Sequence, residues 1–133
     1  MIARTEKPLR FHPRLVLAYA DSAHAALSCR YFRRQGWEAH LANSGSEARR
    51  LAEALGPDMV VLDTELREES GWLTCAKLSG VNRGLKVVLV SQELDGESFA
   101  FADFVGASAL VLRSAGPAAL VDKVPGKSLA PAV

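Results

Sequence analysis

The segment Pro57–Asp63 constrains the fold of this chain more than any other stretch. Four apolar residues, Met59–Leu62, run without interruption into an aspartate, and Gly56 and Pro57 supply a turn before them. A short apolar run bounded by a turn is typical of a strand buried on both faces of a parallel sheet. Because ligands bind at the carboxyl ends of such strands, Asp63 is the first candidate functional residue. The alternative is that Asp63 only caps the following loop.

Comparable strand patterns recur along the chain, and amphipathic helical patterns separate them. The expected strands are Leu15–Ala18, Trp37–Ala42, Met59–Leu62, Lys86–Ser91 and Ala109–Leu112, of which the second is the least apolar and is expected at a sheet edge. The expected helices begin after Asp21, at a capping box of Ser44 and Glu47, and near Trp72, Glu97 and Pro117. This alternation predicts an α/β fold with a single doubly wound, five-stranded parallel sheet.

Apolar spacing also indicates which helix residues face the core. The expected inward positions are Leu27, Tyr31 and Phe32 in the first helix, and Phe101, Phe104 and Val105 in the helix Glu97–Val105. If Phe99 points outward from that helix, it would serve as an apolar anchor for a partner; the alternative is that Phe99 folds onto its own helix.

The chain has 133 residues, which suits one domain with a core that needs neither disulfides nor metals. We expect a flexible basic arm over 1–13, a folded domain over 14–124 and a disordered tail over 125–133. The net charge of +1 gives no reason to expect nucleic acid, and no stretch approaches the ~20 apolar residues of a membrane span. Cys29 and Cys75 lack zinc-ligand spacing and fit reduced thiols in a cytoplasmic protein.

Polar residues end three of the expected strands. Asp63, Ser91 and Arg113 follow parallel strands and so should gather at one edge of the sheet, beside the segment 19–21. A carboxylate, a hydroxyl and a fixed cation that converge at such an edge make a plausible site for an oxyanion or a phosphate.

These residues give the chain a resemblance to the receiver domain of bacterial two-component response regulators, over about 14–124. The matching features are the segment Pro57–Asp63, which ends at the family's phosphoacceptor aspartate, Gly71 after the phosphorylation loop, the strand Val87–Ser91, and the pair Gly106-Ala107 before the last strand. The resemblance implies a flavodoxin-like receiver fold with strand order 2-1-3-4-5. It also implies that Asp63 is the phosphoacceptor, that Ser91 and Arg113 contact the phosphoryl group, and that Thr64 and Glu65 lie in the loop near the site.

Some positions depart from the family's pattern. Where the family has two Mg²⁺-binding acids after the first strand, this chain has Tyr19 and Ala20, and only the next residue, Asp21, is acidic. A methyl group and a neutral phenol cannot replace the carboxylate oxygens that Mg²⁺ prefers, so no metal is expected. If a metal site exists, its ligands are Asp21, Asp63 and Glu65.

Three further departures lie in and after the last strand. Arg113 occupies the position of the family's lysine, and Ser114 replaces the following proline, so a trans peptide bond is expected there. Leu110 occupies the family's aromatic switch position and has no ring that could rotate. We therefore expect the surface of residues 97–124 to be held in one state.

Three functions remain open at this point. The first is a degenerate receiver, a non-enzymatic signalling module that binds a histidine kinase, a phosphotransfer protein or an output protein without a cofactor. The second is a working phosphoacceptor that is phosphorylated on Asp63 with Mg²⁺. The third is a small flavodoxin-like protein that binds a nucleotide or a flavin, but the segment after the first strand carries no glycine-rich phosphate loop.

Overall fold

The computed structural model describes residues 12–121; most of the predicted basic arm and all of the predicted tail lie outside this range. The strands are β1 (Arg14–Ala18), β2 (Glu38–Ala42), β3 (Met59–Asp63), β4 (Lys86–Ser91) and β5 (Ala109–Leu112). The helices are α1 (Ser22–Arg34), α2 (Gly45–Leu55), α3 (Gly71–Val81), α4 (Gly96–Phe104), the 3₁₀ helix η1 (Arg113–Ala115) and α5 (Ala118–Val121). No helix within residues 12–121 is both long enough and apolar enough to span a membrane.

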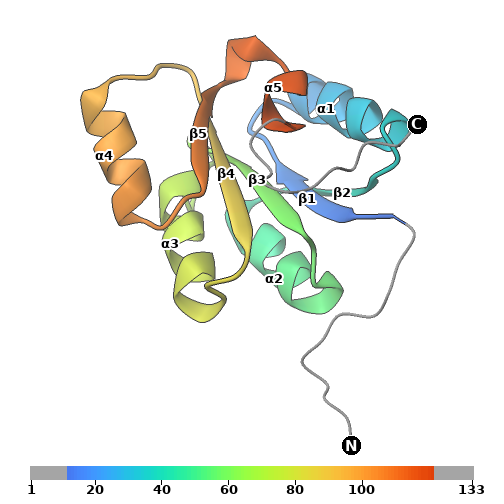
Figure 1. The fold of residues 1–133 in the computed structure, drawn as a ribbon, viewed down its shortest axis with the longest axis horizontal. Helices are drawn as coiled ribbons and strands as arrows, with labels where there is room; N and C mark the ends of the chain where they lie inside the picture. Colours follow the sequence, from blue (N-terminus) through green and yellow to red (C-terminus); the bar gives the residue numbers. More distant parts are fainter. Residues whose placement is uncertain (1–11, 122–133) are drawn as a thin grey trace, which may run out of the picture.

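The strands form one parallel sheet in the order β2-β1-β3-β4-β5, and helices cover both of its faces (Figure 1). This confirms the predicted doubly wound α/β fold, including the edge position of β2. The two described residues before β1 are hydrogen-bonded to the start of β2: Pro13 O accepts from Glu38 N, and His12 Nδ1 lies 3.1 Å from Gly36 O. The peptide bond between Arg113 and Ser114 is trans, as predicted.

Alternation along the strands divides the core between the two faces of the sheet. Leu15, Leu17, Met59 and Val61 belong to the cluster that packs under α1 and α5, while their strand neighbours belong to the cluster under α2, α3 and α4. All of β3 is buried, including its last residue. The sequence pattern of an unbroken apolar run followed by an acid therefore places a carboxylate at full depth at the end of the central strand.

The inward face of α1 differs from the prediction at one position. Leu27 is 55% exposed, whereas the buried residues are Ala25, Ser28, Cys29 and Phe32. These four follow the spacing i, i+3, i+4, i+7 of a single helix face. Small side chains at three of these positions let α1 lie close to the sheet, and Leu27 is left on the outside.

The inward face of α4 also differs from the prediction. Phe101 and Phe104 are 44% and 83% exposed, although both were expected to face the core. Ala102 and Val105 are the residues that face the sheet, at the spacing i, i+3. Phe101 lies one residue before Ala102 on the helix, so its side chain is turned away from the sheet. Phe99 is half exposed.

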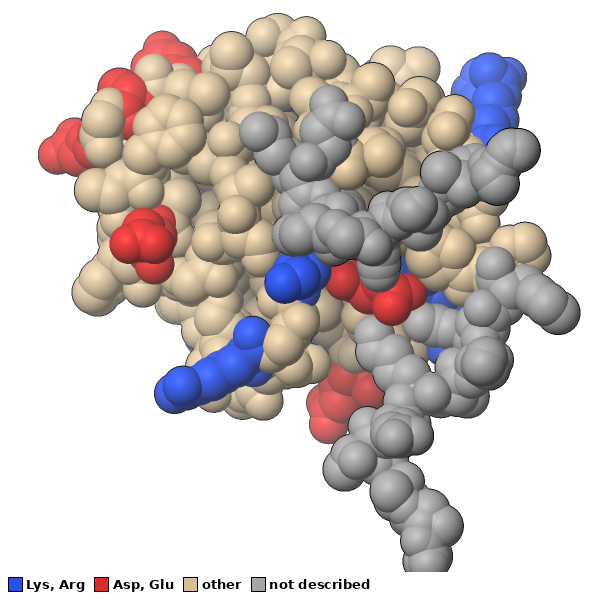
Figure 2. All heavy atoms as spheres, viewed as in Figure 1, with Lys and Arg blue, Asp and Glu red and all other residues tan. Residues whose placement is uncertain are grey.

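Charged side chains are distributed unevenly over the surface. Arg30, Arg33 and Arg34 are exposed on α1. Acidic side chains group over α4, at the upper left of Figure 2, and no basic side chain lies among them on this face. The net charge of +1 therefore conceals a local acidic group over α4 and a local basic group on α1.

Gly71, the first residue of α3, is packed directly against the end of β3. A Cβ atom at this position would lie 2.1 Å from the carbonyl oxygen of Asp63 and 2.9 Å from the Cα of Thr64. Both are backbone atoms, so they can move away only if the strand end itself shifts. The absence of a side chain at Gly71 thus allows α3 to approach Asp63.

This packing generates a stability prediction. Gly71→Ala should lower the free energy of unfolding by about 1–3 kcal/mol, because the added methyl group overpacks a contact between backbone segments. Gly80→Ala is the matched control, since a Cβ at Gly80, on the same helix, meets no atom within 4 Å. The control should raise stability by up to about 1 kcal/mol through helix propensity. Urea denaturation measures both, and equal effects of the two substitutions would contradict the proposed contact.

Candidate functional site

Asp63 is completely buried, and both of its carboxylate oxygens accept hydrogen bonds. Oδ2 accepts from Ala20 N at 3.0 Å and from Arg113 Nη1 at 3.4 Å, while Oδ1 accepts from Glu65 N at 3.0 Å. A buried carboxylate is stable only where such donors replace water. The carboxylate is therefore held by two backbone amides and one cation.

Arg113 reaches Asp63 from the first residue of η1, directly after β5. The sheet order places β4 between β3 and β5, so a side chain that starts beyond β5 must cross one strand to reach Asp63. The Arg113 side chain is only 18% exposed, so solvent screens the pair weakly. The resulting ion pair neutralises the carboxylate inside the protein.

At positions 19 and 20, after β1, the backbone and not the side chains contacts Asp63. Ala20 donates its amide hydrogen to Asp63. The side chain of Tyr19 packs in the core cluster under α1, where its phenol accepts a hydrogen bond from Ser28 Oγ at 3.4 Å. Burial raises the pKa of Tyr19, so the phenol stays neutral at ordinary pH. No charge stands at these two positions.

Asp21 caps α1. Its Oδ1 accepts from Ala23 N at 2.9 Å, and its Oδ2 lies 2.9 Å from His24 Nδ1. The hydrogen bond from the Ala23 amide is the main cause that lowers the pKa of Asp21, and the contact with His24 adds to it. Because both oxygens are engaged at the helix N-terminus, the only acid of the segment 19–21 is committed to α1 and not to Asp63.

Ser91 ends β4 next to the site, but its hydroxyl donates to Glu93 O at 2.9 Å, within its own loop. A hollow of about 480 Å³ lies beside Ser91. Its lining residues are Thr64, Glu65, Trp72, Ser91, Gln92, Glu93 and Ser98, and Asp63 is not among them. Tyr19 and Arg113 line a different hollow, of about 180 Å³, beside α1 and α5. The predicted site residues thus separate into two hollows, with Asp63 buried.

Leu110 is buried in the cluster under α2, α3 and α4, where its side chain is 7% exposed. Its neighbour in the core, Val105, follows α4 directly. A branched aliphatic side chain in this place fills space between α4 and the sheet.

This donor set does not fit Mg²⁺. The ion requires near-octahedral coordination by oxygen ligands, normally with one or two carboxylates. Of the three acids that would form such a site, Asp63 is neutralised by Arg113, and Asp21 is held by α1. Among residues 12–121, no group of three His, Cys, Asp or Glu side chains is placed so that it could hold a metal ion.

Sequence analysis missed a polar cluster centred on Glu69. Arg49 donates two hydrogen bonds to the Glu69 carboxylate, at 2.8 and 2.9 Å, and Thr74 Oγ1 and Lys77 Nζ donate at 2.7 and 3.1 Å. These contacts tie α2 to α3 and to the loop between Asp63 and Gly71. Glu69 lies in an acidic loop, 20 residues after Arg49 in the sequence. No local pattern predicts a pair at this separation, so the contact can be recognised only once the packing of α2 against α3 is known.

Together, the parallel five-stranded sheet, the aspartate at the end of β3 and the basic residue after β5 define a receiver-type α/β domain. A model of the response regulator receiver domain matches residues 17–125, and the chain belongs to this family. It is therefore a receiver domain of two-component signalling.

The chain is also similar to a curated protein and to solved structures. Over 60 residues it is 38% identical to adventurous-gliding motility protein Z of Myxococcus xanthus. The matched segment makes up 44% of this chain and only 4% of that protein. A CheY-like receiver domain protein of Methanospirillum hungatei gives a TM-score of 0.78 at 20% identity, covering 85% of this chain and 90% of that one. A Burkholderia pseudomallei response regulator with a phosphorylated aspartic acid and a calcium ion gives a TM-score of 0.78 at 17% identity. That match covers 88% of this chain and 68% of that one. At these identities, the solved structures show a common fold.

The ion pair at Asp63 generates a second prediction. Arg113→Ala should lower the free energy of unfolding by about 2–4 kcal/mol, because it leaves a fully buried carboxylate without its cation. Arg83→Ala, at an exposed position, should change stability by less than about 0.5 kcal/mol. Both values come from urea denaturation at neutral pH. A loss at Arg113 no greater than that of the control would mean that Asp63 is solvated.

The Glu69 cluster generates a third prediction, on pH. The hydrogen bonds from Arg49 lower the pKa of Glu69 from 4.5 to about 2, with help from Thr74 and Lys77. A folded-state pKa below that of the unfolded chain adds stability that is complete above about pH 4.5 and is lost as the pH falls towards 2. Glu69→Gln should therefore cost about 1–2 kcal/mol at neutral pH, and the difference from wild type should shrink over this window. A difference that is constant between pH 6 and pH 3 would contradict the role of the carboxylate charge.

Proposed function

We propose that this receiver domain is a constitutive protein-binding module of two-component signalling, whose contacts with partners do not depend on phosphorylation of Asp63. The observation that carries the proposal is the complete burial of the Asp63 carboxylate beneath three hydrogen-bond donors. A phosphoacceptor oxygen must attack phosphorus in line with the leaving group, so at least one oxygen must be open to the donor molecule. Asp63 offers no such oxygen.

Charge supports the same proposal. A transferred phosphoryl group needs cations near its equatorial oxygens. Working receivers of this family use a divalent ion that acidic side chains hold. Here one guanidinium replaces both the metal and the lysine, and it already neutralises Asp63. The function that is left to the domain is recognition: it binds a histidine kinase, a phosphotransfer protein or an output protein through a fixed surface and catalyses no reaction of its own.

The alternative, a working phosphoacceptor, has one observation in its favour. Thr64, Glu65 and Ser91 share a hollow at the carboxyl end of the sheet, where the family's phosphoryl group is bound. Opening of the Asp63–Arg113 pair towards this hollow would expose the carboxylate. The following experiment separates the two possibilities.

The fourth prediction concerns phosphorylation. If the chain were a working phosphoacceptor, incubation with acetyl phosphate and Mg²⁺ would transfer a phosphoryl group to an Asp63 oxygen, with release of acetate. We expect no mass increase of the intact wild-type chain under conditions that phosphorylate a working receiver. A mass increase that disappears in Asp63→Asn would refute the constitutive module and establish the phosphoacceptor.

A combined variant tests the physical cause. Tyr19→Asp and Ala20→Asp restore carboxylates after β1, and Arg113→Lys replaces the planar fork by a more flexible ammonium group. We expect this triple variant to bind Mg²⁺ and to become phosphorylated on Asp63, and the same variant with Asp63→Asn serves as its control. If the triple variant folds, which circular dichroism checks, and still resists phosphorylation, then the missing acids are not what closes the site.

A further inference from the structure

Helix α4 exposes aromatic side chains that a folded domain would ordinarily bury. Phe104 is 83% exposed and Phe101 44% exposed, and within α4 only Ala102 is buried. The ring of Phe101 stacks on that of Phe104, at 6.2 Å between centroids, and tilts against Trp72 of α3 at 4.9 Å. The three rings form a continuous apolar surface that begins at Trp72, which also packs against the core cluster under α2, α3 and α4.

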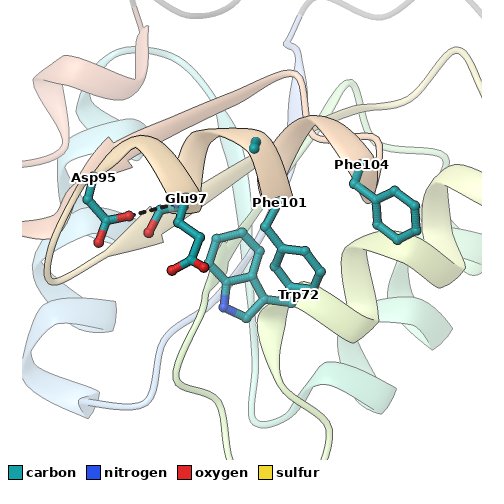
Figure 3. Close-up of a pocket in the computed structure, with 7 residues that line it drawn as sticks. Trp72, Asp95, Glu97, Phe101 and Phe104 are labelled. Carbon is teal, nitrogen blue, oxygen red and sulfur yellow. Dashed lines mark hydrogen bonds between the residues drawn. The ribbon is translucent and has the colours of Figure 1, made fainter.

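These rings line a hollow of about 510 Å³ between α3 and α4. Figure 3 shows Trp72 rising from α3 towards Phe101, with Glu97 and Asp95 beyond it at the start of α4. Trp72 and Ser98 line this hollow and also the hollow of about 480 Å³ beside Ser91, so the two are adjacent. We refer to the two hollows together as the α3–α4 cleft.

The ionisable residues that line the α3–α4 cleft are all acidic: Glu65, Glu93, Asp95 and Glu97. Among the described residues, no Lys, Arg or His lines either hollow. The hydrogen bond from Ser98 N lowers the pKa of Asp95, which therefore stays ionised. By contrast, Arg49 and Lys77 line the hollow between α2 and α3, and three arginines line the hollow beside α1. Negative potential and exposed rings therefore coincide in one place on the molecule.

We propose that the α3–α4 cleft binds a basic amphipathic helical segment of a partner protein. Its apolar residues pack on Phe101, Phe104 and Trp72, and its Lys and Arg side chains face the four acids. An amphipathic helix in an apolar groove is a recurring mode of peptide recognition, and a cation over the Trp72 ring adds attraction. The acidic lining repels nucleic acid and anionic lipid, which leaves a basic polypeptide as the occupant. This inference rests on the proposed function, because it names the class of partner.

The fifth prediction tests the cleft with a defined probe. The probe is a fluorescein-labelled amphipathic peptide with Leu on one face and Lys and Arg on the other, and fluorescence anisotropy with the full chain measures its affinity. Phe104→Ala and Glu97→Lys should each weaken binding about ten-fold, since they remove an exposed ring and reverse a lining charge. Both residues are exposed, so the fold is not at risk.

Phe99→Ala is the matched control. Phe99 lies on the same helix and is 50% exposed, but it does not line the cleft. Its substitution should change the affinity less than about two-fold, and a peptide of the same composition but scrambled order should bind about ten-fold more weakly. Equal binding of the scrambled peptide, or a loss at Phe99 as large as that at Phe104, would overturn the proposal. So would concentration-dependent self-association in sedimentation equilibrium that Glu97→Lys abolishes, because the occupant would then be a second copy.

Repeating the titration with beryllofluoride and Mg²⁺ separates this inference from the proposed function. We expect the same affinity with and without these ions. If the affinity changes in wild type but not in Asp63→Asn, the constitutive module is wrong, while the cleft stands as long as Phe104→Ala weakens binding. If the ions leave the affinity unchanged but Phe104→Ala and Glu97→Lys bind the peptide like wild type, the proposal of a binding cleft is wrong and that of a constitutive module stands.

Discussion

The rest of this structure depends on the fully buried carboxylate of Asp63. A charge at the end of an all-buried strand is tolerated only where donors compensate for the lost water, and three donors from three segments meet there: the amides of Ala20 and Glu65 and the guanidinium of Arg113. The sheet order dictates that the cation must cross β4. An arginine has the length for this and stays charged at any physiological pH. The carboxylate thus fixes the positions of the β1–α1 and β3–α3 loops and of the residue after β5.

The loop that follows Asp63 is restrained at its start and at its end. At its start, Glu65 N donates to Asp63 Oδ1. At its end, Gly71 lies so close to the Asp63 carbonyl that no side chain fits, and Glu69 is bound by Arg49 of α2 and by Thr74 and Lys77 of α3. A switch needs an element with two arrangements of similar free energy. Here the buried ion pair, the glycine contact and the Glu69 cluster all favour the same arrangement of the loop. These contacts support the fixed surface that we propose for this domain.

The sequence predicted the sheet well because its central strands are short, unbroken apolar runs, and strands of this kind are buried on both faces of a parallel sheet. It placed Asp63 and Arg113 at the same edge because the carboxyl ends of parallel strands lie together. It was wrong about Leu27, Phe101 and Phe104, because the largest apolar side chains were taken to mark the core face. The correct face was already present in the spacing of smaller residues: Ala25, Ser28, Cys29 and Phe32 in α1, and Ala102 with Val105 in α4. The cap at Asp21 was predicted from its residue type before the helix. The direction of the Ser91 hydroxyl had no such signal, since it depends on loop geometry.

The internal neutralisation of Asp63 also determines where the negative potential of this edge lies. Because Arg113 pairs with Asp63 inside the protein, the field outside comes from Glu65, Glu93, Asp95 and Glu97, which surround exposed rings on α3 and α4. In a receiver whose carboxylates bind a metal and a phosphoryl group, the charge near this edge would change with each phosphorylation. In this chain the lining acids that would meet a partner are surface residues, separate from the buried Asp63–Arg113 pair. A surface of constant charge beside exposed aromatic rings would favour a basic partner at all times, so the constitutive recognition and the unreactive aspartate that we propose both rest on the same ion pair.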